Sequence, residues 1–461
     1  MLKVLLRVFL FILPLHTILI TRESFLNGTK WEYGTLGFFA TEVLLWVTVF
    51  VFIVWVFKHK NFKFQISHFR LSKDRVFLFF VLLFVLWGYA SVLWSHDKDL
   101  ALQQVLHLME AALLFVMLIA GPLKFRRVGA WFIFGACVVG LLGVGQFVFQ
   151  DTFSSTLLGV SKHVPYEAGT SVVSSSEIGR WLRAYGSFSH PNIFGGYMAI
   201  AFFISVMLFG VRFCRKKKCW IYQYIIPTVL LMGVFMSFSR SAIVVTAVAL
   251  CVVFLYSLSR KKGVFSSYVF VYSLSLFVLL VTVFAPLVYT RLAVSSPQEK
   301  TSLSERSSQV HESWELSKKN IWTGVGAGNY TRALYEIYPD RPGWEYQPVH
   351  NVFLLIFVEL GMIGLILLFC ISVSFLIFVD SFICKGKKRH CWLMKNAGIW
   401  FVLVSIFFPY MFISFFDHYL FSSYIGLMLL VAGAGLTTRC LIDHFHKPST
   451  VCPQEDKISL K

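Results

Sequence analysis

The sequence predicts an all-α protein that crosses a membrane many times. Hydrophobic residues make up 57% of its 461 residues and charged residues only 14%, whereas a soluble globular chain carries about 25% charged residues. Apolar stretches of about 20 residues recur along the chain, and about 20 residues of helix cross the ~30 Å hydrocarbon core of a bilayer. Helices are expected because lipid offers backbone N–H and C=O groups no hydrogen-bond partner. This composition excludes a cytosolic enzyme, a secreted disulfide scaffold and a disordered chain.

Twelve apolar stretches are each long enough to span a bilayer as a helix. The first has Lys3 and Arg7 near its start, like a signal peptide, but no small-residue cleavage site follows it, so we expect a retained anchor. The twelve predicted spans are residues 2–20, 36–57, 76–94, 100–120, 128–149, 191–211, 221–238, 241–259, 264–287, 350–379, 396–416 and 418–438.

Two long polar loops divide the predicted spans into three groups. Loops longer than ~12–15 residues are uncommon and usually functional, and both of these are much longer. The expected regions are an N-terminal five-helix region (1–149), a first periplasmic loop (150–190), a central four-helix region (191–287), a large periplasmic loop (288–349), a C-terminal three-helix region (350–438) and a cytoplasmic tail (439–461).

The distribution of charge orients the predicted spans. The chain has 42 Lys and Arg against 23 Asp and Glu, a net charge of +19. With the N-terminus in the cytoplasm, about two thirds of the basic residues fall in short cytoplasmic segments, where Lys and Arg stay during membrane insertion. Both termini are then cytoplasmic and both long loops periplasmic. The excess charge is scattered over several short segments, which excludes a nucleic-acid-binding groove.

Neither the cysteines nor the nucleotide-binding motifs indicate a cofactor. None of the nine cysteines falls in a predicted periplasmic loop, so no disulfide framework is expected. Cys214 and Cys219 lack a matched His or Cys pair, and we predict no metal site. The sequence contains no phosphate-binding G-x-x-x-x-G-K-[ST] motif, so we do not expect the protein to use ATP.

Polar residues gather where the chain meets the periplasmic side of the predicted membrane. The run from Arg183 to Asn192 leads into the sixth span, with Pro191 at a helix start. We expect His190 to belong to this capped helix start, whereas Arg183 has no obvious structural use and is a candidate functional residue. Arg240 occupies the tight turn between the seventh and eighth spans, and an ionisable residue held at membrane depth indicates a functional site.

The large loop carries a further cluster. Arg306 lies in a helix-like stretch, and residues 324–328 read Gly-Val-Gly-Ala-Gly. Such glycines allow close backbone approach or turns with positive φ. No strand precedes them, so a dinucleotide site is not expected. Arg332 and Arg341 follow, and solvent-exposed surface charge is the simpler interpretation of each.

His350 and Asn351 lie at the periplasmic tip of the tenth span. Histidine, with a pKa of ~6.5, suits proton transfer near neutral pH. Glu359 is nine residues further on, which places it ~13 Å deeper and on another face of the helix, so we do not pair it with His350. Glu359 lies within a predicted span, as do Glu42 and Glu110, and the sequence assigns these three carboxylates no role.

These clusters, in this order, resemble the family of O-antigen ligases and O-antigen polymerases, which is related to the bacterial O-oligosaccharyltransferases. The motifs cover roughly residues 180–365. The matching motifs are Arg183 with Gly-x-Phe-x-His-Pro-Asn, Ser239-Arg240, Arg306 ahead of Gly-Val-Gly-Ala-Gly, His350-Asn351-x9-Gly361-x-x-Gly364, and Asp417-His418-Tyr419 before the last span.

The resemblance implies a glycosyltransferase of the bacterial inner membrane, with its active site on the periplasmic face. The enzyme would move a glycan from an undecaprenyl-diphosphate carrier to an acceptor hydroxyl without a metal or other cofactor. Arg183, Arg240 and Arg306 would bind the diphosphate, since arginine pairs well with phosphate. His350 and Arg240 would be catalytic, with His350 activating the acceptor. Supporting residues are expected to be Asn192, Asn351 and Arg332.

The acceptor distinguishes the possible functions. An O-antigen ligase uses lipid A–core, and the His-Asn pattern favours this function. A polymerase of the same family, which uses a second lipid-linked repeat, stays open as the alternative. An oligosaccharyltransferase is less favoured because the chain is short for that group. A lipid-linked oligosaccharide flippase or transporter is the alternative of a different class, but internal repeats and buried charge pairs, which are typical of transporters, are not evident in the sequence.

Overall fold

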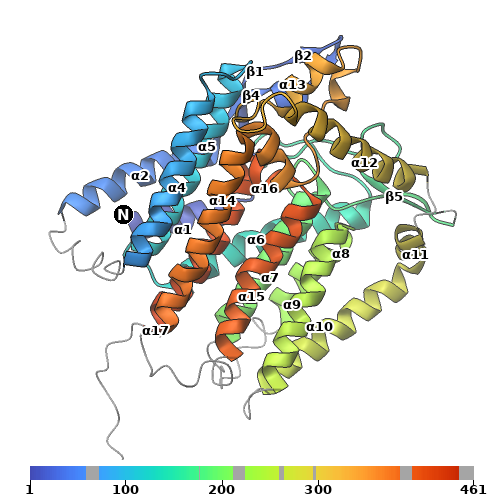
Figure 1. Ribbon diagram of the computed structural model, residues 1–461. Helices are drawn as coiled ribbons and strands as arrows, with labels where there is room; N and C mark the ends of the chain where they lie inside the picture. Colours follow the sequence, from blue (N-terminus) through green and yellow to red (C-terminus); the bar gives the residue numbers. More distant parts are fainter. Residues whose placement is uncertain are drawn as a thin grey trace, which may run out of the picture.

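The computed structural model describes residues 1–58, 72–175, 177–210, 224–258, 264–293, 297–384 and 397–445. Within these ranges the chain is mostly helical, as predicted, and it also contains three two-stranded sheets that the sequence did not predict (Figure 1). Much of the predicted cytoplasmic loops and tail lies outside the described residues, as do Cys214 and Cys219.

The N-terminal region combines helices with two small sheets. Strand β1 pairs antiparallel with β4, and β2 pairs antiparallel with β3. The helices are α1 (Leu2–Ile12), α2 (Ala40–Lys58), α4 (Ser72–Ser91), α5 (Lys98–Ala120) and α6 (Phe125–Phe149), with a 3-10 turn at Glu32–Gly34. The strands are β1 (Ile18–Arg22), β2 (Phe25–Leu26), β3 (Thr29–Lys30) and β4 (Leu36–Phe39).

The prediction for the first span, residues 2–20, was wrong in its extent. Helix α1 ends at Ile12, and residues 18–22 form a strand instead. Pro14 follows directly, and because proline has no N–H and clashes with the preceding turn, it ends the helix. The second predicted span likewise begins later, at Ala40, because residues 36–39 pair with β1.

Among the described residues that follow α6, the regular elements are helices and one β-hairpin. This hairpin lies in the first long loop and is formed by β5 (Val172–Ser175) and β6 (Gly179–Leu182). The central helices are α7 (Pro191–Gly210), α8 (Ile226–Met236), α9 (Arg240–Leu258), α10 (Val264–Val283) and α11 (Ala285–Ala293). The large loop holds α12 (Pro297–Ser317), α13 (Tyr330–Ile337) and a 3-10 turn at Gly343–Glu345. The C-terminal helices are α14 (Val352–Cys384), α15 (Ala397–Phe416), α16 (Tyr419–Ser422) and α17 (Tyr424–Phe445).

Six helices of the described residues are long and apolar enough to cross a membrane, or seven if the bent pair α10 and α11 forms one span. The six are α2, α5, α6, α7, α14 and α17. Shorter apolar helices at residues 75–91, 226–236, 240–251 and 407–416 fall on other predicted spans. The structure thus supports a multi-pass membrane protein, and the count of twelve spans stays a prediction.

The helices pack into one bundle, with α4 against α14, α5 against α17, and α6, α7 and α8 against one another. Strands β1, β2 and β4 and helix α13 lie at one end of this bundle, at the top of Figure 1, and α12 and β5 lie next to them toward the right of the view. We call this part of the bundle the loop end. At Gly143 of α6 an added Cβ would lie 2.4 Å from the Phe194 ring, so glycine lets α6 and α7 approach closely.

Helix α14 is interrupted at Gly361, whose φ of 70° lies in the left-handed region. The glycine-rich residues 324–328 fill this break. Val325 N donates to Val358 O (2.9 Å) and Gly326 N to Glu359 O (2.8 Å). Gly328 N donates to the Glu359 carboxylate (2.8 Å). The glycine run therefore makes the close backbone approach and positive-φ turns that the sequence suggested, and Glu359 anchors it.

Candidate active site

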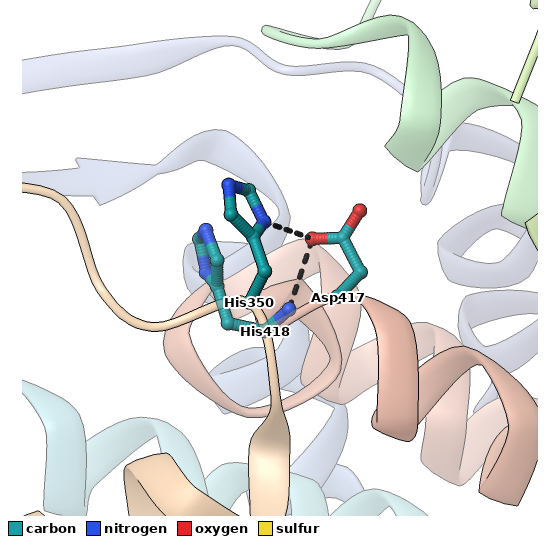
Figure 2. Close-up of side chains that lie close together, drawn as sticks. All are labelled: His350, Asp417 and His418. Carbon is teal, nitrogen blue, oxygen red and sulfur yellow. Dashed lines mark hydrogen bonds and ion pairs between the residues drawn. The ribbon is translucent and has the colours of Figure 1, made fainter. Parts of the chain in front are cut away.

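The polar motifs that lie far apart in the sequence meet at Asp417, in the break between α15 and α16. Its Oδ2 accepts a hydrogen bond from Asn192 Nδ2 (3.0 Å), and its Oδ1 accepts one from the His418 backbone N–H (2.9 Å). Nδ1 of His350 lies 3.6 Å from the same Oδ1 (Figure 2). Asp417 is only 4% exposed, so its charge is directed at these neighbours rather than at solvent.

The local chain geometry explains how Asp417 reaches this position. Its N–H still donates to Ile413 O (2.8 Å), which is the last helical bond of α15. His418 then begins the short helix α16, and its Nδ1 lies 2.6 Å from Ser422 Oγ, one turn further on. The two histidine rings face each other with centroids 5.1 Å apart.

His350 is placed by the start of α14. Asn351 caps this helix, because its Oδ1 accepts hydrogen bonds from Phe353 N (2.9 Å) and Leu354 N (3.0 Å). Asn351 Nδ2 also donates to Phe415 O (3.2 Å), which ties the start of α14 to the end of α15. The His350 side chain keeps 23% of its surface exposed. The site therefore presents an accessible imidazole backed by a buried carboxylate.

Arg183 continues the network on the other side of Asp417. Its Nη2 donates to Asn192 Oδ1 (2.7 Å) and its Nε to Ser237 O (2.7 Å). Burial lowers the pKa of Arg183 to about 10, so the guanidinium stays charged at neutral pH. Asn192 thus links a buried cation to a buried anion. Since two Arg183 donors already hold protein groups, only part of its hydrogen-bonding capacity is left for a ligand.

His190 fulfils the structural role that the sequence favoured. Its Nδ1 accepts a hydrogen bond from Asn192 N (3.1 Å) at the start of α7, and its Nε2 lies 3.2 Å from Ser171 Oγ. Burial, followed by the positive charge of Arg183, lowers the pKa of His190 to about 3. His190 is therefore neutral and able to accept.

The electrostatics of the histidine–aspartate group are consistent with this geometry. Burial and the nearby His350 lower the pKa of His418 to about 3. Burial alone would raise the pKa of Asp417, but its interaction with His350 and the charge of His418 bring that pKa below its usual range. Asp417 is consequently an ionised carboxylate at physiological pH.

Four arginines form a positively charged region beside this network. Arg240 is the exposed first residue of α9, and Arg306 is partly exposed on α12. Their positive charges act on one another, and the charges of Arg183, Arg240 and Arg306 all act on Arg291 of α11. Arg291 was not singled out in the sequence, because it lies at the end of an apolar stretch outside any motif.

Arg332 and Arg341 have partners elsewhere in the large loop. Arg332 lies on α13, with its Nε 3.7 Å from the Glu336 carboxylate one turn away. Arg341 Nη1 pairs with the buried Glu312 at 2.8 Å and its guanidinium covers the Tyr338 ring. The structure therefore gives both residues contacts that stabilise the loop.

Two groups of described residues could offer three ligand atoms to a metal ion: His350 with Asp417 and His418, and Glu42 with His107 and Glu110. In the first group most ligand atoms are already engaged, since both Asp417 oxygens accept hydrogen bonds and His418 Nδ1 contacts Ser422 Oγ. This group therefore fits a hydrogen-bonded network better than a metal centre.

A comparison with protein families bears on this arrangement. Residues 225–369 match the family model described as O-antigen ligase. This segment is therefore similar to the O-antigen ligase family. The match confirms the resemblance predicted from the motifs, and the matched segment carries Arg240, Arg306 and His350. No curated protein matches the chain.

The O-antigen ligase segment supplies only part of the candidate site. Arg183 and Asn192 precede it, and Asp417 follows it by almost 50 residues. The sequence indicated Asp417 only because residues 417–419 resemble some family members, although a charged residue immediately before an apolar span is itself a signal. The fold, rather than the matched segment alone, brings Asp417 to His350.

Proposed function

We propose that this protein is an O-antigen ligase that transfers a glycan from an undecaprenyl-diphosphate carrier to an acceptor hydroxyl at the periplasmic face of the bacterial inner membrane. The observation that carries the proposal is that the O-antigen ligase segment places His350 against the buried Asp417, beside a group of arginines. A polar site at one end of an apolar helix bundle suits a substrate with a lipid tail and a diphosphate head.

The proposed reaction is a direct displacement. The acceptor oxygen attacks the anomeric carbon, and its proton passes to His350. The bond between that carbon and the phosphate oxygen breaks, and the diphosphate leaves with the electron pair. Asp417 orients and stabilises the protonated imidazole. Both Asp417 oxygens accept hydrogen bonds, which suits an orienting role better than nucleophilic attack.

The arginines supply positive charge where the leaving group gains negative charge. Arg240 and Arg306 are the accessible members, and Arg291 joins them. Arg183, more deeply buried, holds Asn192 against Asp417. This chemistry uses side chains alone, and we propose that the transfer step needs no metal ion or other cofactor.

The acceptor decides between ligase and polymerase, so the test offers both. Purified protein is given a lipid-diphosphate glycan together with either lipid A–core or a second lipid-linked repeat, and the products are separated. Product on lipid A–core supports the ligase, whereas a lengthened lipid-linked glycan identifies the polymerase. Absence of both products from folded protein would refute the transferase proposal and favour a flippase or transporter.

The role of the arginines is tested in the same assay with a matched pair of variants. Arg240→Ala is expected to lower transfer by at least ~100-fold, because removing one donor to developing charge typically has an effect of this size. Lys318→Ala, which removes an exposed cation that pairs with Glu315, is the control and should stay within about twofold of the wild type. Equal losses in both variants would contradict the assignment of Arg240.

A further inference from the structure

A second polar cluster lies inside the N-terminal part of the bundle, outside the candidate active site. It consists of Glu42 on α2 and of His107 and Glu110 on α5. The exposed fractions of these residues are 2%, 6% and 0%. One ligand atom from each lies within 4.8 Å of the other two. His107 and Glu110 are three residues apart, so they share one face of α5.

Each carboxylate in this cluster has one oxygen held by the protein. Phe39 N donates to Glu42 Oε2, and Trp46 Nε1 donates to Glu110 Oε1 (2.6 Å). The other two oxygens, Glu42 Oε1 and Glu110 Oε2, are buried without a hydrogen-bond partner among the described residues, and so is His107 Nε2. His107 Nε2 lies 3.2 Å from Glu42 Oε1, within ion-pair distance but outside hydrogen-bond geometry.

One oxygen held by the protein and one left for a further partner is the arrangement expected of a carboxylate that binds a metal ion. A carboxylate ligand gives one oxygen to the ion, and a hydrogen bond from an outer residue fixes the other. Phe39 N and Trp46 Nε1 occupy those outer positions. Buried polar atoms are normally hydrogen-bonded, so three neighbouring atoms without hydrogen-bond partners among the described residues indicate a missing common partner. Two buried carboxylates also need positive charge to offset their loss of water.

The chemistry of the three atoms selects the class of ion. One imidazole nitrogen with two carboxylate oxygens is a mixed set that suits Zn²⁺ and similar transition metals better than Mg²⁺ or Ca²⁺, which prefer oxygen alone. Bonds of ~2.1 Å in a tetrahedral site put neighbouring ligand atoms ~3.4 Å apart. The observed 3.2 Å between His107 Nε2 and Glu42 Oε1 is close to that spacing.

We propose that Glu42, His107 and Glu110 bind a divalent transition-metal ion that joins α2 to α5. The ion supports the start of α17, because the Tyr424 ring packs on His107 with centroids 5.2 Å apart. Gln104 Nε2 on α5 also donates to Phe421 O of α16 (2.7 Å). The ion would thus stabilise the face of α5 on which residues 419–424 rest. The role is structural and does not depend on the proposed function.

The test measures metal binding directly. Tag-free full-length protein in detergent is treated with chelator, equilibrated with ZnCl₂ and desalted, and bound zinc is counted by mass spectrometry. The wild type is expected to retain one zinc per chain and to unfold at a higher temperature than its metal-free form. Glu42→Gln and Glu110→Gln keep the side-chain size, and each should weaken zinc binding at least tenfold and abolish the rise in Tm.

Two control variants locate the ion. Asp417→Asn removes the carboxylate of the other three-residue group, and His96→Asn removes a half-exposed histidine. Both should bind zinc as the wild type does. Loss of zinc in Asp417→Asn with retention in Glu110→Gln would place the ion at the other group and overturn the proposal. Folded wild type that binds no zinc would also overturn it and would leave a proton as the compensating charge.

A second measurement covers the case in which a variant does not fold. Co²⁺ bound to wild-type protein is expected to show weak visible bands without a thiolate charge-transfer band, and X-ray absorption at the zinc edge should show only nitrogen and oxygen ligands. A thiolate band or sulfur ligands would assign the metal to the cysteines and refute the site.

Discussion

At the scale of single residues, the candidate site is a buried carboxylate with an accessible imidazole. His350 Nδ1 faces Asp417 at 3.6 Å while part of the ring stays exposed. The sequence predicted His350 from its place at a span tip, but nothing in the spacing paired it with a residue 67 positions later. The spacing of Glu42 and Glu110 in the sequence likewise did not predict their contact, because only the packing of α2 on α5 brings them together.

The His350–Asp417 pair predicts a specific effect on transfer. His350→Gln should lower the rate by ~10²–10⁴-fold, the usual contribution of a general base. Asp417→Asn keeps the size of the side chain and should lower the rate at least ~10-fold. A rate of transfer in Asp417→Asn equal to that of the wild type would show that Asp417 takes no part in transfer.

The buried His418 predicts a pH dependence of stability. Its pKa is lowered to about 3, against ~6.5 in an unfolded chain. Between these values the unfolded chain binds a proton that the folded chain does not, so stability is complete above pH 6.5 and declines as the pH falls. At pH 5 the contribution of His418 to this loss would be about 2 kcal/mol. Thermal unfolding from pH 7 to pH 5 measures it.

The His418→Gln variant tests whether His418 causes this pH effect. Its Tm should fall less between pH 7 and pH 5 than the Tm of the wild type. His311→Gln removes a histidine that is mostly exposed on α12 and should leave the wild-type slope unchanged. Equal slopes in all three proteins would contradict the assignment to His418.

At the scale of elements, the break in α14 is the feature with the clearest energetic consequence. A Cβ at Gly361 would lie 2.2 Å from Trp322 O, and the φ of 70° disfavours any L side chain. Gly361→Ala should therefore detach residues 321–328 from the helix and lower Tm by several degrees. Gly145→Ala in α6, where nothing lies within 4 Å of the added atom, is the matched control and should be neutral or stabilising.

Hydropathy predicted most helices but not the form of their ends. The spans at α5, α6, α7 and α14 were predicted within a few residues, because long apolar runs have one stable form in lipid. Residues 18–20 and 36–39 are also apolar, yet they pair as strands. An apolar run alone does not distinguish a strand that follows Pro14, such as β1, from the end of a helix.

At the scale of the whole molecule, the outward surfaces of the helices are apolar. Val43, Phe50 and Phe57 of α2 and Phe369 of α14 are more than half exposed, as expected for side chains that face lipid. The polar side chains of the candidate site instead gather toward the loop end. The sequence predicted this separation through the expected membrane topology. It did not predict which of the polar motifs contact one another at the site.

The topology gives a prediction for intact cells. Ser308 is exposed on α12 at the loop end, and Lys58 is exposed at the far end of α2. In a cysteine-free background, Ser308→Cys should react with a membrane-impermeant maleimide added outside spheroplasts, because we propose that the loop end is periplasmic. Lys58→Cys should react only after the cells are opened. The reverse pattern would invert the proposed orientation.

The position of Asp417 also affects when the protein can become active. During synthesis Arg183, Arg240 and His350 leave the ribosome well before the last two long helices. Until residue 417 has emerged and α15 has inserted, the nascent chain holds the cations and the imidazole but lacks the carboxylate that faces them. On the proposed function, a partly inserted chain would transfer glycan poorly, and insertion of the C-terminal helices would complete the site.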